Sequence, residues 1–301
     1  MAKSQVSVST LNASFKECLK ELLEYGVETK PRGEKVKEII NYSIVVENPR
    51  NRVITFADRK TSMKYLLGEF IWYLSGSPNV QDINMYSKFW EAIAKEDGTV
   101  NSNYGTRIFG HSKLYPFNQW NKAKELLQKD KDSRQAIIRI NHADDYTYMN
   151  LDVPCTLTLQ FFIRNNALHL VVNMRSNDIW RGYCNDQFQF TMLQELMMLE
   201  LREFYPDLQL GKYYHNAASM HIYEMHFEAA KKIIASDEAM EFYMPEMQID
   251  PDSIQNLIQF EKSWRILQDM DKSKIPENEF YQKLNSYWKS VINLFFVGGQ
   301  L

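Results

Sequence analysis

The sequence has few of the features that identify several common protein classes. Its 301 residues include only three cysteines, Cys18, Cys155 and Cys184, too few for a disulfide framework and without the CxxC spacing of a metal site. No apolar run approaches the roughly 18 residues that suggest a membrane span. The net charge of -3 gives no sign of the clustered basic surface that nucleic-acid-binding proteins usually carry. We therefore expect no metal, membrane or nucleic-acid partner.

The sequence also has few signs of targeting segments, repeats or linkers. Nothing near Met1 has the order of charged, apolar and small residues that marks a signal peptide. No internal repeat, low-complexity segment or Gly/Ser-rich linker divides the sequence. These absences predict a cytoplasmic protein. The hydrophobic content of 45% is ample for a sizeable core, and the length fits one large domain or one domain with an appendage.

Hydrophobic periodicity predicts both helices and strands. Residues 10–25 have helical spacing, with Ser9 or Thr10 as the cap and Gly26 as the stop. Further helices are predicted at 61–74, ended by Gly76, and at 187–204, and amphipathic helices broken near Pro245, Pro251 and Pro276 are predicted beyond Tyr223. Strands are predicted at 39–46, 135–140, 156–163 and 168–174, the last two joined by a turn at Asn165-Asn166. This order predicts an α+β fold, with a mixed sheet packed against helices.

Cys155 is a candidate nucleophile because of its neighbours. It follows Pro154 at the start of a predicted strand, and Arg175 lies on the next strand of the same hairpin. A nearby cation stabilises the thiolate, which is the reactive form of cysteine. A single intracellular cysteine is more often an inert core residue. The Cys155 environment lacks the Gly-Ser-Cys-aromatic signature of papain-like proteases.

The run from Arg175 to Asp186, Arg-Ser-Asn-Asp-Ile-Trp-Arg-Gly-Tyr-Cys-Asn-Asp, together with Pro154-Cys155, resembles the active-site core of the thymidylate synthase family. Other motifs of that family occur in the same order over roughly residues 10–230. They are Arg32, the segment Gly68-Glu69-Phe70-Ile71-Trp72-Tyr73-Leu74, Trp90, Asn101-Ser102-Asn103-Tyr104-Gly105, Asp132-Ser133-Arg134 and His221-Ile222-Tyr223. Several motifs in register are far more specific than any one of them.

The resemblance implies a role for each of these residues. Cys155 would attack C6 of a pyrimidine, Glu69 and Tyr104 would manage proton and water transfer, and Asp186 would read the base. The implied substrate-binding residues are Arg32, Arg134 and Arg175 for the phosphate, Ser176 and Asn185 beside them, and His221 and Tyr223 for the sugar. The implied residues for the co-substrate 5,10-methylenetetrahydrofolate are Trp90, Asp178 and Gly182. Arg134 would reach the neighbouring site of a homodimer.

Asp186 indicates which base is read. Thymidylate synthases have asparagine at this position, and its amide offers a donor and an acceptor to uracil. An ionised carboxylate only accepts hydrogen bonds. Cytosine presents an amino donor at C4 and a ring nitrogen, N3, with which a carboxyl group can share a proton. Asp186 therefore favours cytosine, and the chain resembles the deoxycytidylate 5-hydroxymethylase branch of the family.

Each residue also has a structural interpretation. Glu69 could be a solvated helix-edge residue, His221 a core histidine, Asp178 a helix N-cap and Gly182 a turn residue. Arg32 and Arg134 could be ordinary surface charges. Gln135 stands where thymidylate synthases have a second phosphate-binding arginine, which leaves that contact open. Ser176 is the serine of deoxynucleotide-using relatives.

These observations predict a one-carbon transferase that converts dCMP to 5-hydroxymethyl-dCMP. The alternatives are a CMP 5-hydroxymethylase of a nucleoside-antibiotic pathway, a dCMP or dUMP C5-methyltransferase, and a dimeric nucleotide-binding pseudoenzyme. We expect residues 1–235 to form the catalytic domain, and residues 236–301 to form a helical extension of the same domain with no assigned role.

Overall fold

The central element is one eight-stranded mixed sheet with strand order β1-β3-β8-β6-β5-β4, in which β2 pairs with β3 and β7 pairs with β8. The computed structural model describes residues 5–8, 10–110, 117–146, 152–236, 240–266 and 272–298. The strands are β1 (Gln5–Val8), β2 (Val27–Thr29), β3 (Val36–Val46), β4 (Ile137–Arg139), β5 (Thr156–Arg164), β6 (Ala167–Met174), β7 (Asn177–Asp178) and β8 (Gln209–Tyr223). Strands β6 and β7 run parallel to β8, whereas β3 runs antiparallel to it.

Ten α-helices accompany the sheet in the part of the chain that the structure describes. They are α1 (Leu11–Tyr25), α2 (Met63–Ser75), α3 (Phe89–Ile93), α4 (Tyr104–Phe109), α5 (Gln119–Lys129), α6 (Cys184–Leu201), α7 (Phe227–Ala235), α8 (Ser253–Ile266), α9 (Glu279–Lys283) and α10 (Ser286–Ile292). The chain divides into two compact units. Unit 1 comprises residues 1–61, 122–141 and 155–244, and unit 2 comprises residues 62–121, 142–154 and 245–301.

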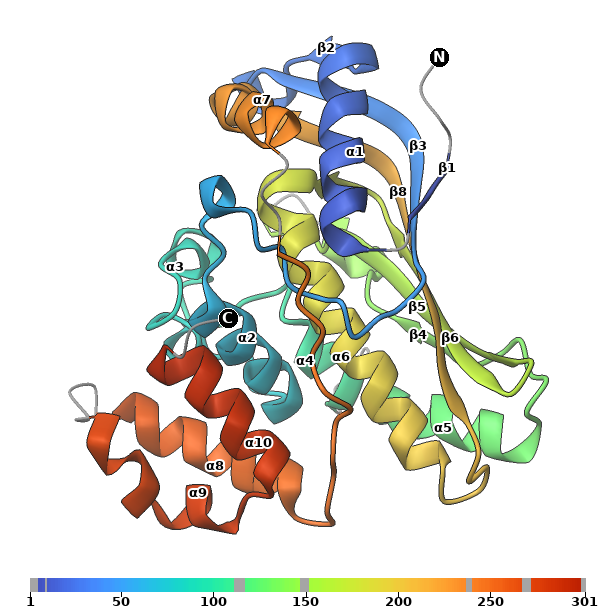
Figure 1. Cartoon of the computed structure of the whole chain (residues 1–301), viewed down its shortest axis with the longest axis vertical. Helices are drawn as coiled ribbons and strands as arrows, with labels where there is room; N and C mark the ends of the chain where they lie inside the picture. Colours follow the sequence, from blue (N-terminus) through green and yellow to red (C-terminus); the bar gives the residue numbers. More distant parts are fainter. Residues whose placement is uncertain are drawn as a thin grey trace. The chain divides into compact units, whose positions relative to one another are not determined.

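Unit 1 contains the whole sheet, and α1 and α6 lie along one face of it (Figure 1). Side chains alternate between buried and partly exposed along the strands, so that Phe161, Val172 and Tyr213 point into this core. Helix α6 is buried on most of its surface, because apolar residues occur all around it. Glu195 of α6 is fully buried and is neutralised by ion pairs from Arg52 at 2.6 Å and Arg50 at 2.7 Å.

Unit 2 is helical, and its C-terminal helices pack on α2. Phe70 of α2 stacks on Trp288 of α10, with ring centroids 6.4 Å apart. Tyr86 donates a hydrogen bond of 2.9 Å to Glu261 of α8, which also pairs with Arg265. Helices α8 and α10, which lie in the segment to which the sequence assigned no role, thus form part of the core around α2.

Most of the predicted elements are confirmed. Helix α1 is capped by Thr10, while Ser9 lies outside the described residues, and α2 ends at Gly76 in the left-handed conformation. Asn165 and Asn166 have φ values of 50° and 56°, as the tight β5–β6 turn requires. Strand β4 is shorter than predicted. Pro245 and Pro251 lie in a segment without helix, and Pro276 lies in a 3-10 turn.

Two elements of unit 1 differ more from the prediction. Helix α6 begins at Cys184, directly after a π-helical turn at Ile179–Tyr183, three residues earlier than predicted. Strand β8 was not predicted at all, because polar residues such as His215 and Lys212 interrupt its apolar alternation. The missed strand is the longest in the sheet, and it carries His221 and Tyr223 at its end.

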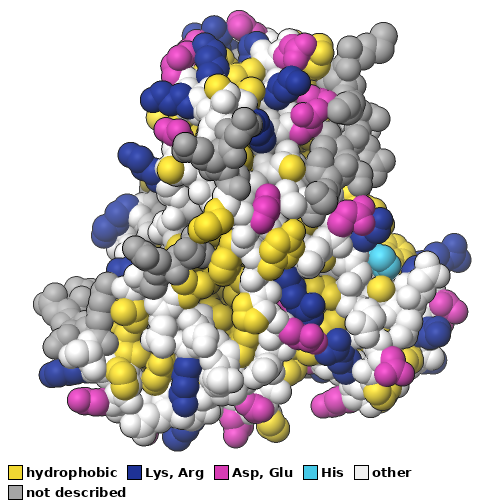
Figure 2. Space-filling view, in the orientation of Figure 1, with side chains coloured by type: hydrophobic (Ala, Val, Ile, Leu, Met, Phe, Trp, Pro, Cys, Tyr) yellow, Lys and Arg dark blue, Asp and Glu magenta, His cyan; other side chains and the backbone are white. Residues whose placement is uncertain are grey.

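Basic and acidic side chains are mixed over the face of the molecule shown in Figure 2. Within the described residues, no helix is both long enough and apolar enough to cross a membrane. The same residues contain no cluster of three or more His, Cys, Asp or Glu side chains that could hold a metal ion.

Candidate active site

Cys155 and Arg175 are held opposite each other at the open end of the β5–β6 hairpin. The backbone N–H of Arg175 donates a hydrogen bond of 2.8 Å to the carbonyl of Cys155. The strand register is irregular between Thr156 and Thr158, so β5 departs from regular pairing directly after the cysteine. Cys155 is partly exposed, as a nucleophile must be. The hairpin therefore places the backbones of Cys155 and Arg175 side by side, so the two residues share one hairpin as the sequence predicted.

Strand β7 brings Asp178 beside His221. The two residues are register partners in the parallel pairing of β7 with β8, and the ring of His221 lies 5.4 Å from that of Tyr223. Burial raises the pKa of Asp178, although His221 opposes this shift, and burial lowers the pKa of His221.

The two carboxyl oxygens of Asp178 differ in their hydrogen bonds. Its Oδ1 accepts a hydrogen bond of 2.8 Å from the N–H of Trp180 and so caps the π-helical turn, as the structural interpretation predicted. Its Oδ2 is buried, and none of the described residues donates a hydrogen bond to it. A buried acceptor of this kind normally has a donor partner. This oxygen therefore fits a ligand that presents N–H groups.

Asp186 lies in the first turn of α6 and is held by Asn177. The Nδ2 of Asn177 donates a hydrogen bond of 2.7 Å to Oδ2 of Asp186. Burial raises the pKa of Asp186 to about 7; the bond from Asn177 opposes this shift and the charge of Asp178 adds to it. Near neutral pH, the carboxyl can therefore either hold a proton or release it.

A buried chain of polar side chains continues from Asn177 into β8. Oδ1 of Asn177 lies 3.0 Å from Nε2 of His215, and Nδ1 of His215 lies 2.7 Å from the hydroxyl of Tyr213. Sequence reasoning missed all three residues. His215 and Tyr213 lie in the unpredicted strand, and Asn177 was quoted within the motif without a role.

Unit 2 gathers Glu69, Trp90 and Tyr104 around two further tyrosines. Glu69 is 4% exposed and accepts hydrogen bonds from Tyr65 at 2.8 Å and from Tyr73 at 3.4 Å. Nε1 of Trp90 donates to the hydroxyl of Tyr65 at 3.2 Å. The ring of Tyr73 lies 5.6 Å from that of Tyr104. Tyr65 and Tyr73 flank Glu69 at a spacing of four residues, a signal in the sequence that could have identified them.

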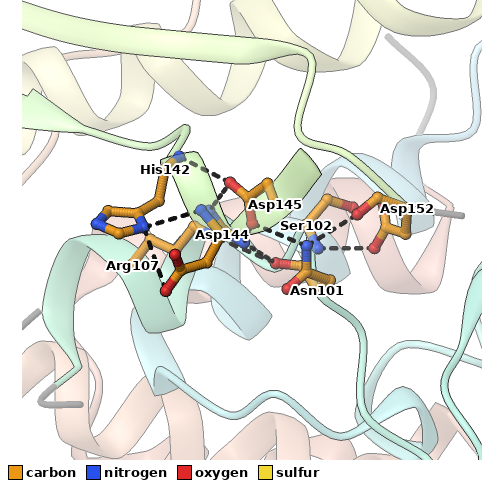
Figure 3. A network of polar contacts seen from close by, with 7 residues as sticks. All are labelled: Asn101, Ser102, Arg107, His142, Asp144, Asp145 and Asp152. Atoms are coloured by element: carbon orange, nitrogen blue, oxygen red, sulfur yellow. Dashed lines mark hydrogen bonds and ion pairs between the residues drawn. The ribbon is translucent and has the colours of Figure 1, made fainter. Parts of the chain in front are cut away.

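The segment before Tyr104 is fixed by the polar network of Figure 3, in which Arg107 makes two contacts of 2.7 Å with Asp145. Arg107 also donates to the carbonyl of Asn101, and Asp152 accepts a hydrogen bond of 2.7 Å from the N–H of Ser102. Burial acts to raise the pKa of Asp145, but hydrogen bonds from Arg107, His142 and Asn101 outweigh it and hold that pKa below its usual value. The network orders the loop that starts α4 at Tyr104.

The remaining predicted residues lie at the surface of unit 1 or near it. Arg32 is exposed and has a left-handed φ of 51°. Burial raises the pKa of Tyr223, and the positive charge of Arg32 opposes this shift. Arg134 is exposed in the loop before β4. The side-chain amide of Asn185 donates to the carbonyl of Arg181 at 2.8 Å, so that donor serves its own turn. Ser176 directly follows Arg175 and is partly buried.

Comparisons with known proteins give a consistent result. The family model described as thymidylate synthase matches residues 13–275. The chain is 32% identical over 202 residues to the deoxycytidylate 5-hydroxymethyltransferase of Enterobacteria phage T6, covering 65% of this chain and 78% of that protein. It is 27% identical over 290 residues to the deoxyuridylate hydroxymethyltransferase of Bacillus phage SP01, covering 93% of this chain and 72% of that protein.

A solved structure has the same fold. The thermostable thymidylate synthase A from Bacillus subtilis matches with a TM-score of 0.64 and 23% sequence identity, covering 81% of this chain and 90% of that chain. The α+β fold with a mixed sheet, predicted from the sequence, is thereby confirmed.

Proposed function

Because this chain belongs to the thymidylate synthase family, whose members transfer a one-carbon unit to C5 of a pyrimidine nucleotide, we propose that it converts dCMP to 5-hydroxymethyl-dCMP. The observation that carries this proposal is the carboxyl of Asp186, which occupies the base-reading position of the family motif. The motif's asparagine is replaced by a group that can share one proton with its ligand.

A carboxyl with a pKa of about 7 suits cytosine. One oxygen accepts from the 4-amino group, and the other shares a proton with N3, which gives a two-point contact. The fully ionised carboxylate would face the lone pair of N3 without a proton between them. Attack at C6 pushes electron density toward N3, and a proton held there by Asp186 stabilises that charge.

The covalent step belongs to Cys155. Its thiolate adds to C6 of the pyrimidine, which makes C5 nucleophilic, and C5 forms the new bond to the one-carbon unit. The C5 proton then leaves, the bond between the methylene carbon and the folate nitrogen breaks to release tetrahydrofolate, and an exocyclic methylene remains on the base. Water adds across that methylene to give the hydroxymethyl group as the Cys155–C6 bond breaks. Arg175, held beside Cys155, binds the nucleotide phosphate and favours the thiolate.

The one-carbon unit comes from 5,10-methylenetetrahydrofolate, the co-substrate that the family uses. The buried Oδ2 of Asp178 fits the N–H and amino groups of a pterin, because none of the described residues donates to it. Trp90 and Gly182 are the other residues that we assign to this molecule. Asp178 holds and orients it, while bound folate supplies the methylene carbon.

Glu69 and Tyr104 are assigned to the proton and to water. Glu69 is buried among tyrosines, and a hydroxyl donor on its carboxylate orients it for proton transfer. In this proposal, Glu69 and Tyr104 act on the base only through the proton or the water molecule that they transfer. His221 and Tyr223 bind the sugar hydroxyl, and Ser176 and Asn185 line the nucleotide beside Arg175.

We also propose a homodimer in which Arg134 binds the phosphate in the neighbouring subunit, with Arg32 binding it from the same chain. The sheet face opposite α1 and α6 supports this, because partly exposed apolar residues such as Phe162 and Val171 lie on it and Ile137 is 41% exposed. A face of this kind is suited to burial against a second copy. Sedimentation of the full chain at micromolar concentration tests this: a fully active monomer would contradict it.

The resemblance to a deoxyuridylate hydroxymethyltransferase over 93% of the chain makes dUMP the second candidate substrate. A protonated carboxyl could donate to O4 of uracil, so the two bases need a direct test. The full chain is incubated with methylenetetrahydrofolate and dCMP, CMP, dUMP or UMP, and the products are identified by mass spectrometry. We expect 5-hydroxymethyl-dCMP. Faster turnover of dUMP or CMP, a methylated product, or full activity of a Cys155→Ala variant would contradict the proposal.

A further inference from the structure

A directed hydrogen-bonded chain ends on Asp186. It runs from the hydroxyl of Tyr213 to Nδ1 of His215 (2.7 Å), from Nε2 of His215 to Oδ1 of Asn177 (3.0 Å), and from Nδ2 of Asn177 to Oδ2 of Asp186 (2.7 Å). Tyr213 and His215 are fully buried. None of the steps proposed above uses these three residues.

The chain has one direction. The amide oxygen of Asn177 can only accept, so Nε2 of His215 is the donor. Burial lowers the pKa of His215 to about 3, so the ring is neutral and carries one N–H. Nδ1 therefore accepts from Tyr213, and every hydrogen bond donates toward Asp186.

The packing holds this direction. The ring of Tyr183 lies 5.0 Å from that of His215 in an edge-on arrangement, and its hydroxyl lies 3.3 Å from Oγ of Ser14. A Cβ on residue 182 would lie 2.8 Å from Nδ2 of Asn177, so only glycine leaves this space. The amide of Asn177 is held by a hydrogen bond at its oxygen and another at its nitrogen.

A protonated carboxyl is ambiguous on its own. Cytosine needs a donor opposite N3 and an acceptor opposite its 4-amino group, whereas uracil needs an acceptor opposite N3–H and a donor opposite O4. One carboxylic acid satisfies either base, depending on which oxygen carries the proton. The hydrogen bond from the N–H of Asn177 removes this freedom. The oxygen that accepts this bond is the stronger acceptor when it is the carbonyl oxygen, so the proton resides on the other oxygen.

We propose that Tyr213, His215 and Asn177 are positioning residues that confine the proton of Asp186 to Oδ1 and thereby set which pyrimidine the carboxyl reads. This rests on the proposed function, in which Asp186 contacts the base. With dCMP, Oδ1 faces N3 and Oδ2 accepts from the 4-amino group. A carboxyl group alone could bind either base. The hydrogen-bonded chain gives Asp186 a fixed arrangement of one donor oxygen and one acceptor oxygen.

The test is the ratio of kcat/KM for dCMP to that for dUMP, measured on full-length variants. In His215→Met the donor to Asn177 is lost, and we expect the ratio to fall by about tenfold or more, the scale of one hydrogen-bonded base contact. In His215→Gln, one amide supplies both a donor and an acceptor, and the ratio should stay within about threefold of wild type. Tyr213→Phe removes a single oxygen and should lower the ratio by a smaller factor. Tyr214→Phe, on the other face of β8, should leave it unchanged.

The outcomes separate the two proposals. If His215→Met does not fold, the ratio measured for Tyr213→Phe provides the test instead. If His215→Met and Tyr213→Phe lower kcat/KM equally for dCMP and dUMP, the ratio is unchanged and the positioning role is wrong. If Asp186→Asn also leaves the preference unchanged, the proposed base contact itself is wrong. If Asp186→Asn shifts the preference and the chain variants do not, only the positioning role fails.

Discussion

Gly182 leaves the space into which the amide of Asn177 fits. A Cβ at position 182 would lie 2.8 Å from Nδ2 of Asn177 and 3.3 Å from Oδ2 of Asp186. The first distance is shorter than real Cβ contacts allow, so the amide would have to move. The resemblance assigns this glycine to the co-substrate, and the structure adds a close approach within the protein.

We therefore predict that Gly182→Ala lowers kcat/KM for dCMP by about tenfold or more, because it displaces the hydrogen-bond donor of Asp186. Steady-state kinetics with saturating folate measure this. Gly98→Asn is the matched control: Gly98 has a left-handed φ of 75°, which asparagine tolerates, and nothing lies within 4 Å of its Cβ position. Equal activity of Gly182→Ala and wild type would contradict the prediction.

The activity on dCMP should depend on pH through Asp186. The carboxyl holds a proton below its pKa of about 7 and loses it above, so binding of neutral cytosine weakens as pH rises through that value. We expect kcat/KM for dCMP to fall by about tenfold per pH unit on the alkaline side. The charged or titratable groups around it are Asp178, Cys184, Tyr213 and His215. An alkaline limb that survives in Asp186→Asn would assign the titration to another group.

Tyr65 links Trp90 to Glu69, so Tyr65→Phe should impair proton and water transfer. We predict a fall in kcat of about tenfold or more with KM for dCMP within about twofold, because the ring stays in place and only the hydroxyl is lost. Tyr73→Phe is the comparison: its hydroxyl is 3.4 Å from Glu69 against 2.8 Å for Tyr65, so its effect should be smaller. A larger effect of Tyr73→Phe would contradict this order.

The Arg107–Asp145 pair should contribute strongly to the stability of unit 2. Both side chains are buried, and Arg107→Met leaves a carboxylate without its cation, which costs about 3–5 kcal/mol in the free energy of unfolding. The exposed pair of Lys122 and Glu125 offers a control, since Lys122→Met should cost less than about 1 kcal/mol. Chemical denaturation measures both. Similar small losses would show that the buried network is dispensable.

The stability of the protein should also depend on pH in the acidic range, because of Asp145. The pKa of Asp145 in the folded protein lies below the ordinary value of 3.8, so its stabilising effect is complete above pH 3.8 and is lost as pH falls through the folded pKa. An Asp145→Asn variant cannot titrate at this position. Its deficit in unfolding free energy relative to wild type should therefore be constant near neutral pH and shrink in acid. A deficit independent of pH down to pH 2 would contradict this.

Much of the site could be predicted because its residues lie in local motifs. Cys155 and Arg175 occupy one hairpin, and the residues from Arg175 to Asp186 are contiguous. The fold class followed from the mixture of helical and strand periodicities. The roles of these residues, by contrast, came only from the resemblance and stay proposals.

The environment of Asp186 could not be predicted, because it forms only when distant segments pair. Asn177 reaches His215 because β7 pairs with β8, and β8 was hidden by its polar residues. The raised pKa of Asp186 also depends on burial, which the sequence pattern does not report. Periodicity reports which face of an element is apolar, but not which polar groups meet inside the core.

The most direct test of the central claim is the base preference of Asp186→Asn. An asparagine amide offers one donor and one acceptor, which match O4 and N3–H of uracil. Wild type and variant are assayed for tritium release from [5-³H]dCMP and [5-³H]dUMP with methylenetetrahydrofolate. We predict that wild type prefers dCMP and that the variant loses this preference by about a hundredfold or reverses it. An unchanged preference for dCMP in the variant would show that Asp186 does not read the base.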